Sequence, residues 1–144
     1  MLDQLELQKI LPQAYPFLLI DRVENVQPGQ SLVAIKNITS DEWPLMNCSE
    51  RLSHYPEALL IEAAAQAALV LYHLIKFKDD GRQFKYSLGK IEANLTRFLL
   101  PPARIQFHAN ANKILDVGGF SEIKIFDDSG SVGWCEIFYS VRKI

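Results

Sequence analysis

The sequence predicts an α+β domain in which an antiparallel sheet wraps around one long central helix. The first observation is an apolar run from Ala58 to Ile75, which is too long for an ordinary strand and suits a helix of about five turns. The second is that other segments alternate apolar and polar residues, as strands do when one face of a sheet is buried. Because a helix that is apolar all round needs to be buried, we expect the sheet to enclose it.

The composition fits one globular domain that spans residues 1–144. Of the 144 residues, 49% are hydrophobic and 22% are charged, so the chain can bury a core. The formal net charge of −2 gives no sign of a nucleic-acid-binding protein. Two cysteines, Cys48 and Cys135, are too few for a disulfide framework. The acidic start MLDQLELQKI lacks the layout of a signal peptide, and the expected location is cytoplasmic.

The N-terminal part predicts a short helix followed by two strands. Residues Leu5–Gln13 form an amphipathic stretch that we expect to stop near Pro12. Residues Phe17–Gln27 are typical of a strand, and the Pro28-Gly29 pair that follows is typical of a turn. Residues Ser31–Thr39 are then the returning strand.

The long helix has recognisable ends. Pro56 stands where helix starts tolerate proline, and Glu57 places a favourable negative charge in the first turn. We expect the helix to end near Phe77. The apolar run is also long enough to cross a membrane, but it contains Glu62 and Gln66 and is rich in alanine, which favours a buried helix.

The C-terminal third predicts further strands. The segment RIQFHANANKI (residues 104–114) alternates polar and apolar residues cleanly. The segment that follows, residues 119–141, is typical of a hairpin with its turn at Asp127–Gly130. A single sheet of about five or six strands leaves open edges, which self-association would cover.

Several motifs, in this order and at this spacing, resemble one known family. They are LQKILPQAYPFLLIDRV (residues 7–23), KNIT (36–39), DE (41–42), IEAAAQ (61–66) and YSLGKIEANLTRFLLPPARI (86–105). The series resembles the 3-hydroxyacyl-acyl carrier protein dehydratases of the FabZ type along the full length of the chain.

The resemblance implies a hotdog fold, in which a sheet surrounds a sausage-like helix. It implies a homodimer or a trimer of dimers, with the active site at the dimer interface. A histidine of one subunit removes the C2 proton of a 3-hydroxyacyl thioester, and a glutamate on the central helix of the other subunit protonates the departing hydroxyl. Backbone N–H groups at the helix start polarise the thioester carbonyl. The substrate is carried by acyl carrier protein, or by coenzyme A, in fatty-acid or polyketide-type lipid synthesis.

By this resemblance Glu62 is the catalytic carboxylate. Gln66 lies four residues later on the same helix face and is expected to hydrogen-bond Glu62. The apolar setting of Glu62 suits a proton donor. The residues alone also fit a carboxylate that pairs with an arginine at a subunit seam.

The histidine half of the family pair is replaced. The Gly-His-Phe-Pro motif aligns with residues 47–50, NCSE, so that Cys48 stands at the position of the base. A thiol near a carboxylate is a poor general base, and a free cysteine is more often a buried, inert residue. His54, in the sequence SHYP, is a candidate substitute base, although it lies only 8 residues before Glu62 whereas Cys48 lies 14 before it.

The helix start and two other positions also depart from the family. The family's Met-Pro-Gly is Tyr55-Pro56-Glu57 here, and these residues together with Gln66 are the candidate substrate-binding group. The backbone N–H of Glu57 can still donate to a thioester oxygen, although its side chain brings negative charge near that point. The usual His-Arg is Gln13-Ala14, and the usual Gly-Asp is Pro102-Ala103.

The charge pattern gives a weaker indication of a partner. Seven basic and three acidic residues lie between Lys76 and Arg104, a local net charge of +4. Such a rim suits an acidic carrier protein, and it equally suits an ordinary solvated face. No cofactor is expected, and no histidine–carboxylate spacing indicates a metal site.

Three functions follow as hypotheses. The first is a dehydratase that uses Glu62 as acid and a substitute base. The second is a non-catalytic or half-catalytic subunit that pairs with a true dehydratase as a heterodimer and lends it Glu62. The third is a thioesterase in which Glu62 activates water or attacks the thioester. The dehydratase hypothesis is favoured by the resemblance, and the second hypothesis by the loss of the base.

Overall fold

The computed structural model describes residues 1–39, 41, 54–77 and 84–143, and it contains one curved antiparallel sheet and two helices within those residues. The elements, in chain order, are α1 (Gln4–Ile10), β1 (Arg22–Gln27), β2 (Ser31–Ile38), α3 (Glu57–Lys76), β3 (Phe84–Leu95), β4 (Ala103–Leu115), β5 (Gly118–Asp127) and β6 (Gly130–Lys143). The strand order in the sheet is β1-β2-β4-β5-β6-β3.

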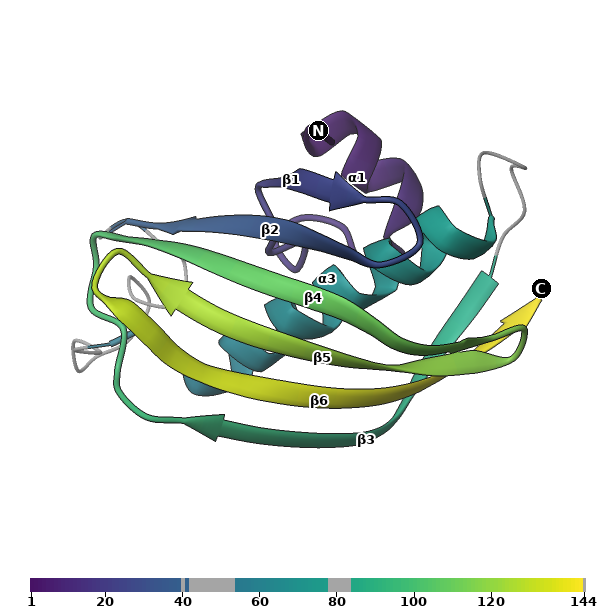
Figure 1. Ribbon diagram of the computed structural model, residues 1–144. Helices are drawn as coiled ribbons and strands as arrows, with labels where there is room; N and C mark the ends of the chain where they lie inside the picture. Colours follow the sequence, from purple (N-terminus) through teal and green to yellow (C-terminus); the bar gives the residue numbers. More distant parts are fainter. Residues whose placement is uncertain (40, 42–53, 78–83, 144) are drawn as a thin grey trace.

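The sheet curves around α3, which lies across its inner face (Figure 1). The inner side chains of β4, Ile105, Phe107 and Ala109, are all fully buried, and the alternation predicted for this strand is confirmed. Across β5, Ile123 and Ile125 continue the same buried layer. The predicted α+β architecture, a sheet around one long helix, is therefore confirmed.

Helix α3 forms the centre of the core. It starts after Pro56, whose extended backbone makes it the N-cap, and it carries Glu57 in the first turn as predicted. It ends at Lys76, where the Phe77 N–H closes the last turn on the His73 carbonyl. By length and composition α3 could cross a membrane, but 61% of its most apolar window is buried inside the protein. The prediction of a buried core helix is confirmed.

The N-terminal segment differs from the sequence prediction in two respects. The strand expected from Phe17 begins only at Arg22. The reason is that the Phe17 carbonyl and the Leu19 N–H hydrogen-bond to the side chain of Gln66 instead of to a neighbouring strand. The short helix α1 was predicted as Leu5–Gln13, and it ends at Ile10, about one turn earlier, with a capping box at its start.

The C-terminal hairpin agrees with the prediction. Strands β5 and β6 pair in antiparallel fashion from Gly118–Ser140 to Asp127–Gly130, with the turn where the sequence placed it. At that turn the Asp127 carboxylate accepts hydrogen bonds from the Ser129 N–H and from both terminal nitrogens of Arg97. Arg97 follows β3 in the chain, so this contact attaches the end of the edge strand to the hairpin.

Candidate functional site

Glu62 is a half-buried carboxylate on α3, in the stretch where the helix changes from partly exposed to fully buried residues. Its Oε1 atom accepts two amide hydrogen bonds, from Gln13 Nε2 and from Gln66 Nε2, each 3.3 Å long. Within the described parts of the chain no donor reaches Oε2. The carboxyl group is therefore held by the described residues through one oxygen, Oε1.

Gln66 connects the site to the N-terminal segment. Its side chain is fully buried, and its Oε1 accepts from the Leu19 N–H at 2.9 Å. Its Nε2 donates to the Phe17 carbonyl at 2.7 Å as well as to Glu62. The hydrogen bond predicted between Gln66 and Glu62 is confirmed, and Gln66 also holds residues 17–19 against the helix.

Gln13 is a partner of Glu62 that the sequence pattern does not identify. The side chain comes from the segment between α1 and β1, 49 residues away from Glu62 in the chain. The sequence marks Gln13 only as a departure from the family motif. Its contact with Glu62 cannot be deduced from local spacing, because the two residues are far apart in the chain. The Oε1 atom of Gln13 is buried and has no hydrogen-bond partner among the described residues.

The helix start offers backbone donors. The Tyr55 side chain is buried, and its backbone N–H donates to the Leu99 carbonyl at 2.9 Å. The N–H groups of Glu57 and Ala58 belong to the first turn, where a helix supplies no intrahelical acceptor. These two groups, next to the Pro56 cap, are therefore backbone donors at the positive end of the helix dipole.

His54 lies beside the helix start but does not contact Glu62. Its Nε2 is 3.3 Å from Glu57 Oε1, and its ring stacks on Phe98 with ring centroids 4.2 Å apart. Glu57 and Glu62 are separated by about 7.5 Å along the helix axis and by about 140° around it, at about 1.5 Å and 100° per residue. One chain therefore does not assemble a His54–Glu62 pair.

Of the two cysteines, the structure describes only Cys135. Cys48, at the position of the family's histidine, lies outside the described residues. Cys135 lies on the inner face of β6, is fully buried, and has its thiol pKa raised to about 11 by desolvation. Cys135 is therefore part of the core and takes no part in the site.

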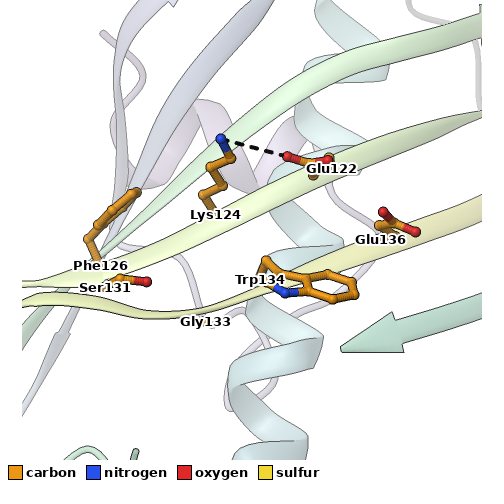
Figure 2. Close-up of a pocket in the computed structure, with 7 residues that line it drawn as sticks. All are labelled: Glu122, Lys124, Phe126, Ser131, Gly133, Trp134 and Glu136. Atoms are coloured by element: carbon orange, nitrogen blue, oxygen red, sulfur yellow. Dashed lines mark ion pairs between the residues drawn. The ribbon is translucent and has the colours of Figure 1, made fainter. Parts of the chain in front are cut away.

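An open hollow of about 300 Å³ lies on the other face of the sheet. Figure 2 shows it over β5 and β6, with α3 behind the strands. Its lining residues are Glu122, Lys124, Phe126, Ser131, Gly133, Trp134 and Glu136. Glu122 and Glu136 face each other across the two strands, and the next pair along the strands, the fully buried Ile123 and Cys135, points to the opposite face. This hollow is thus separated from Glu62 by the sheet.

Metal binding has no visible basis in the part of the chain that the structure describes. No group of three or more His, Cys, Asp or Glu side chains is gathered there. The site consists of one carboxylate, two amides and the backbone N–H groups of a helix start, which suits acid–base chemistry on a polar organic substrate.

The chain is similar to known proteins over most of its length. A family model described as "FabA-like domain" matches residues 11–134. A 3-hydroxyacyl-[acyl-carrier-protein] dehydratase FabZ from Saccharophagus degradans is 37% identical over 121 residues, covering 83% of this chain and 81% of that protein. A protein of the same name from Clostridium novyi is 31% identical over 139 residues, covering 96% of both chains.

The solved structures share the fold at low sequence identity. The dehydratase heterocomplex ApeI:P from Xenorhabdus doucetiae has a TM-score of 0.77 and 18% identity, covering 93% of this chain and 89% of that chain. A thioesterase from Haemophilus influenzae has a TM-score of 0.72 and 11% identity, covering 99% of this chain and 92% of that chain. The predicted hotdog fold is confirmed, and it is a fold on which both kinds of protein occur.

Proposed function

The chain belongs to the FabA-like family, among the FabZ-type dehydratases of the hotdog fold, and on this premise we propose that it removes water from 3-hydroxyacyl thioesters carried by acyl carrier protein. The observation that carries the proposal is Glu62. It is a half-buried carboxyl on the central helix, held by two amides through Oε1, with Oε2 left for the substrate.

In the proposed reaction Glu62 acts as the acid. A base takes the C2 proton, the C2 electron pair forms the C2–C3 double bond, and the C3–O bond breaks. Glu62 gives its proton to the departing oxygen, which leaves as water. The Glu57 and Ala58 N–H groups stabilise negative charge on the thioester oxygen while the C2 proton is removed. A proton must then return from the base to Glu62 to complete the cycle.

The base is proposed to come from a second chain. His54 is directed to Glu57 and Phe98 within its own chain, so it can serve only a neighbour's Glu62 or no Glu62 at all. Cys48, at the motif position, carries a thiol, which is a poor general base near a carboxylate. Both facts favour an assembly in which two chains share one site.

The free edge of β3 supports such an assembly. Leu88 and Ile91 point to the inner face, yet they are 42% and 38% exposed. A second copy that pairs its β3 with this edge would extend the sheet and cover these side chains. We propose a homodimer of this kind as the basic unit, with a trimer of dimers as the larger form to be measured.

Two other functions have specific support. The held position of His54 favours a half-catalytic subunit that lends Glu62 to a histidine-bearing dehydratase. The unoccupied Oε2 of Glu62 favours a thioesterase in which that oxygen takes a proton from an attacking water. Neither is needed if the homodimer alone forms enoyl thioesters.

One set of assays separates these functions. Purified protein is given 3-hydroxyacyl and saturated acyl thioesters of several chain lengths, on carrier protein and on coenzyme A, alone and mixed with a histidine-bearing homologue. We expect enoyl thioester from the protein alone and a loss of at least about a hundredfold in rate for Glu62→Gln. Enoyl product only in the mixture would establish the half-catalytic subunit, and thiol release without enoyl product would establish the thioesterase.

A further inference from the structure

The two amides that hold Glu62 are themselves held very differently. The Gln66 amide is anchored at both ends, because its Oε1 accepts from the Leu19 N–H and its Nε2 donates to the Phe17 carbonyl. Within the part of the chain that the structure describes, the Gln13 amide has one partner, the Glu62 carboxyl, and its buried Oε1 has none. Only one of the two amides is therefore fixed in orientation by the rest of the protein.

An unpaired buried carbonyl costs free energy, and nearly all buried polar groups in native proteins avoid it. Gln13 Oε1 therefore does not contribute to the stability of the fold. A leucine or methionine at this position would fill the same space without leaving an acceptor unpaired. The polarity of Gln13 needs a reason other than folding, and its one contact is the carboxyl of the proposed acid.

The chemistry of an acid–base carboxyl supplies a reason. An ionised carboxylate only accepts hydrogen bonds, whereas a protonated carboxyl has an O–H that needs an acceptor. Gln66 presents its donor end, Nε2, to Glu62. Turning its amide over to present Oε1 instead would break its hydrogen bonds with the Leu19 N–H and the Phe17 carbonyl. Gln13 can provide the acceptor, since a half-turn of its amide exchanges Nε2 and Oε1.

The half-turn leaves the number of unpaired ends unchanged. In the observed orientation Nε2 donates to Glu62 and Oε1 is unpaired. In the turned orientation Oε1 accepts from the Glu62 O–H and Nε2 is unpaired. Because one end lacks a partner in both orientations, the protonation state of Glu62 decides which orientation is preferred.

We propose that Gln13 is a positioning residue for Glu62, whose amide donates to the carboxylate and, turned over, accepts from the protonated carboxyl. The part of this proposal that concerns catalysis rests on the proposed function, because it assumes that Glu62 changes protonation state in each turnover. The part that concerns hydrogen bonding is independent of any substrate and is tested separately.

The direct test is a pH titration of ¹⁵N-labelled protein followed by NMR. The side-chain amide signals of Gln13 are identified as those that disappear in Gln13→Met. We expect them to move as Glu62 becomes protonated, by more than the signals of Gln66, which keeps its Phe17 acceptor, and to stay in place in Glu62→Gln. Gln13 signals that do not respond, or that respond equally in Glu62→Gln, would overturn the proposal.

The kinetic test compares three variants. Gln13→Met should lower kcat by about tenfold or more with KM little changed, because Glu62 loses its orientation rather than its substrate. Its melting temperature should not fall, since the unpaired acceptor is removed. Gln13→His should recover most of kcat, because a ring nitrogen donates or accepts according to its tautomer. Gln8→Met, an exposed glutamine on α1, is the matched control and should behave as the wild type.

The remaining outcomes each decide something. If Gln13→Met lowers the melting temperature and the activity falls with the folded fraction, Gln13 is a structural residue and the proposal is wrong. If Gln13→Met leaves kcat unchanged, Gln13 does not position Glu62. If the wild type and Glu62→Gln are equally inert toward every thioester, the proposed function fails, and the NMR titration still decides whether the Gln13 amide follows the protonation of Glu62.

Discussion

Strands β5 and β3 pair with opposite sides of β6, and their inner faces are in opposite states. The inner side chains Ile123 and Ile125 of β5 are fully buried, whereas Leu88 and Ile91 of β3 are about two-fifths exposed. The two strands share the same neighbour, so pairing does not explain the difference. What differs is the cover, because α3 packs mainly on β2, β4, β5 and β6. It meets β3 near the start of that strand, where the Tyr72 ring contacts the Tyr86 ring, and Leu88 and Ile91 follow farther along the strand.

A single chain therefore buries the inner face of one part of its sheet and leaves the β3 edge partly exposed. The half of the sheet under α3 has a closed core. The β3 edge has apolar side chains on its inner face, at the same level as the buried Ile137 of β6. The site has the same asymmetry, since Glu62 is held within one chain while no base among the described residues reaches it there. We therefore expect a second chain both to cover the exposed β3 edge and to provide the base that Glu62 lacks within its own chain.

The largest expected effect comes from placing a charge on the uncovered edge. Ile91→Lys puts an ammonium group where the second copy would pack, and a charge buried there without a partner is strongly unfavourable. We expect a folded monomer without dehydratase activity, measured by light scattering, circular dichroism and the enoyl assay. Asn94→Lys adds the same charge on the outer face of β3 and should stay assembled and active. An Ile91→Lys protein that still dimerises would rule out β3 as the contact.

The second largest expected effect is a difference in stability between truncations on the two inner faces, measured in the monomeric Ile91→Lys background. Ile123→Ala should reduce the free energy of unfolding by about 2–5 kcal/mol, because it leaves a cavity under α3. Leu88→Ala should cost less than about 1 kcal/mol, since Leu88 is already about two-fifths exposed in the single chain. Urea denaturation of both variants gives the two values. Equal losses would show that the inner face of β3 is covered within a single chain after all.

The elements that the sequence predicted well are those whose signal is local. The periodicity of α3 and the alternation of β4 and of the β5–β6 hairpin come from neighbouring residues, and the structure places these elements close to the predicted positions. The predicted start of β1 was wrong. Gln66, which is 47 residues away from Leu19 in the chain, binds the Leu19 N–H and the Phe17 carbonyl, which a strand would have paired with a neighbouring strand. Non-local partners of this kind are not visible in local patterns.

The candidate site follows the same rule: its local contact could be predicted from the sequence and its non-local contact could not. Glu62 and its contact with Gln66 follow from the motif and from helical spacing, and the contact is present in the structure. Gln13 was noticed only as a departure from the family, because its contact with Glu62 depends on how the N-terminal segment crosses the helix. The roles of Cys48 and His54, and the cytoplasmic location, stay predictions.

The smallest expected effect concerns the contact that attaches β3 to the covered half. Hydrogen bonds from Arg97 hold the pKa of Asp127 below its usual 3.8, against a smaller opposing effect of burial. A carboxyl whose folded pKa is lowered stabilises the protein above the unfolded pKa, and this contribution is lost as the pH falls through the folded pKa. Asp127→Asn should therefore lower the melting temperature slightly at about pH 7, and the difference from the wild type should shrink below about pH 4. Asp128→Asn, at an exposed turn residue next to it, is the control. A difference that persists unchanged to the lowest pH at which the protein stays folded would show that Asp127 acts through its shape and not through its charge.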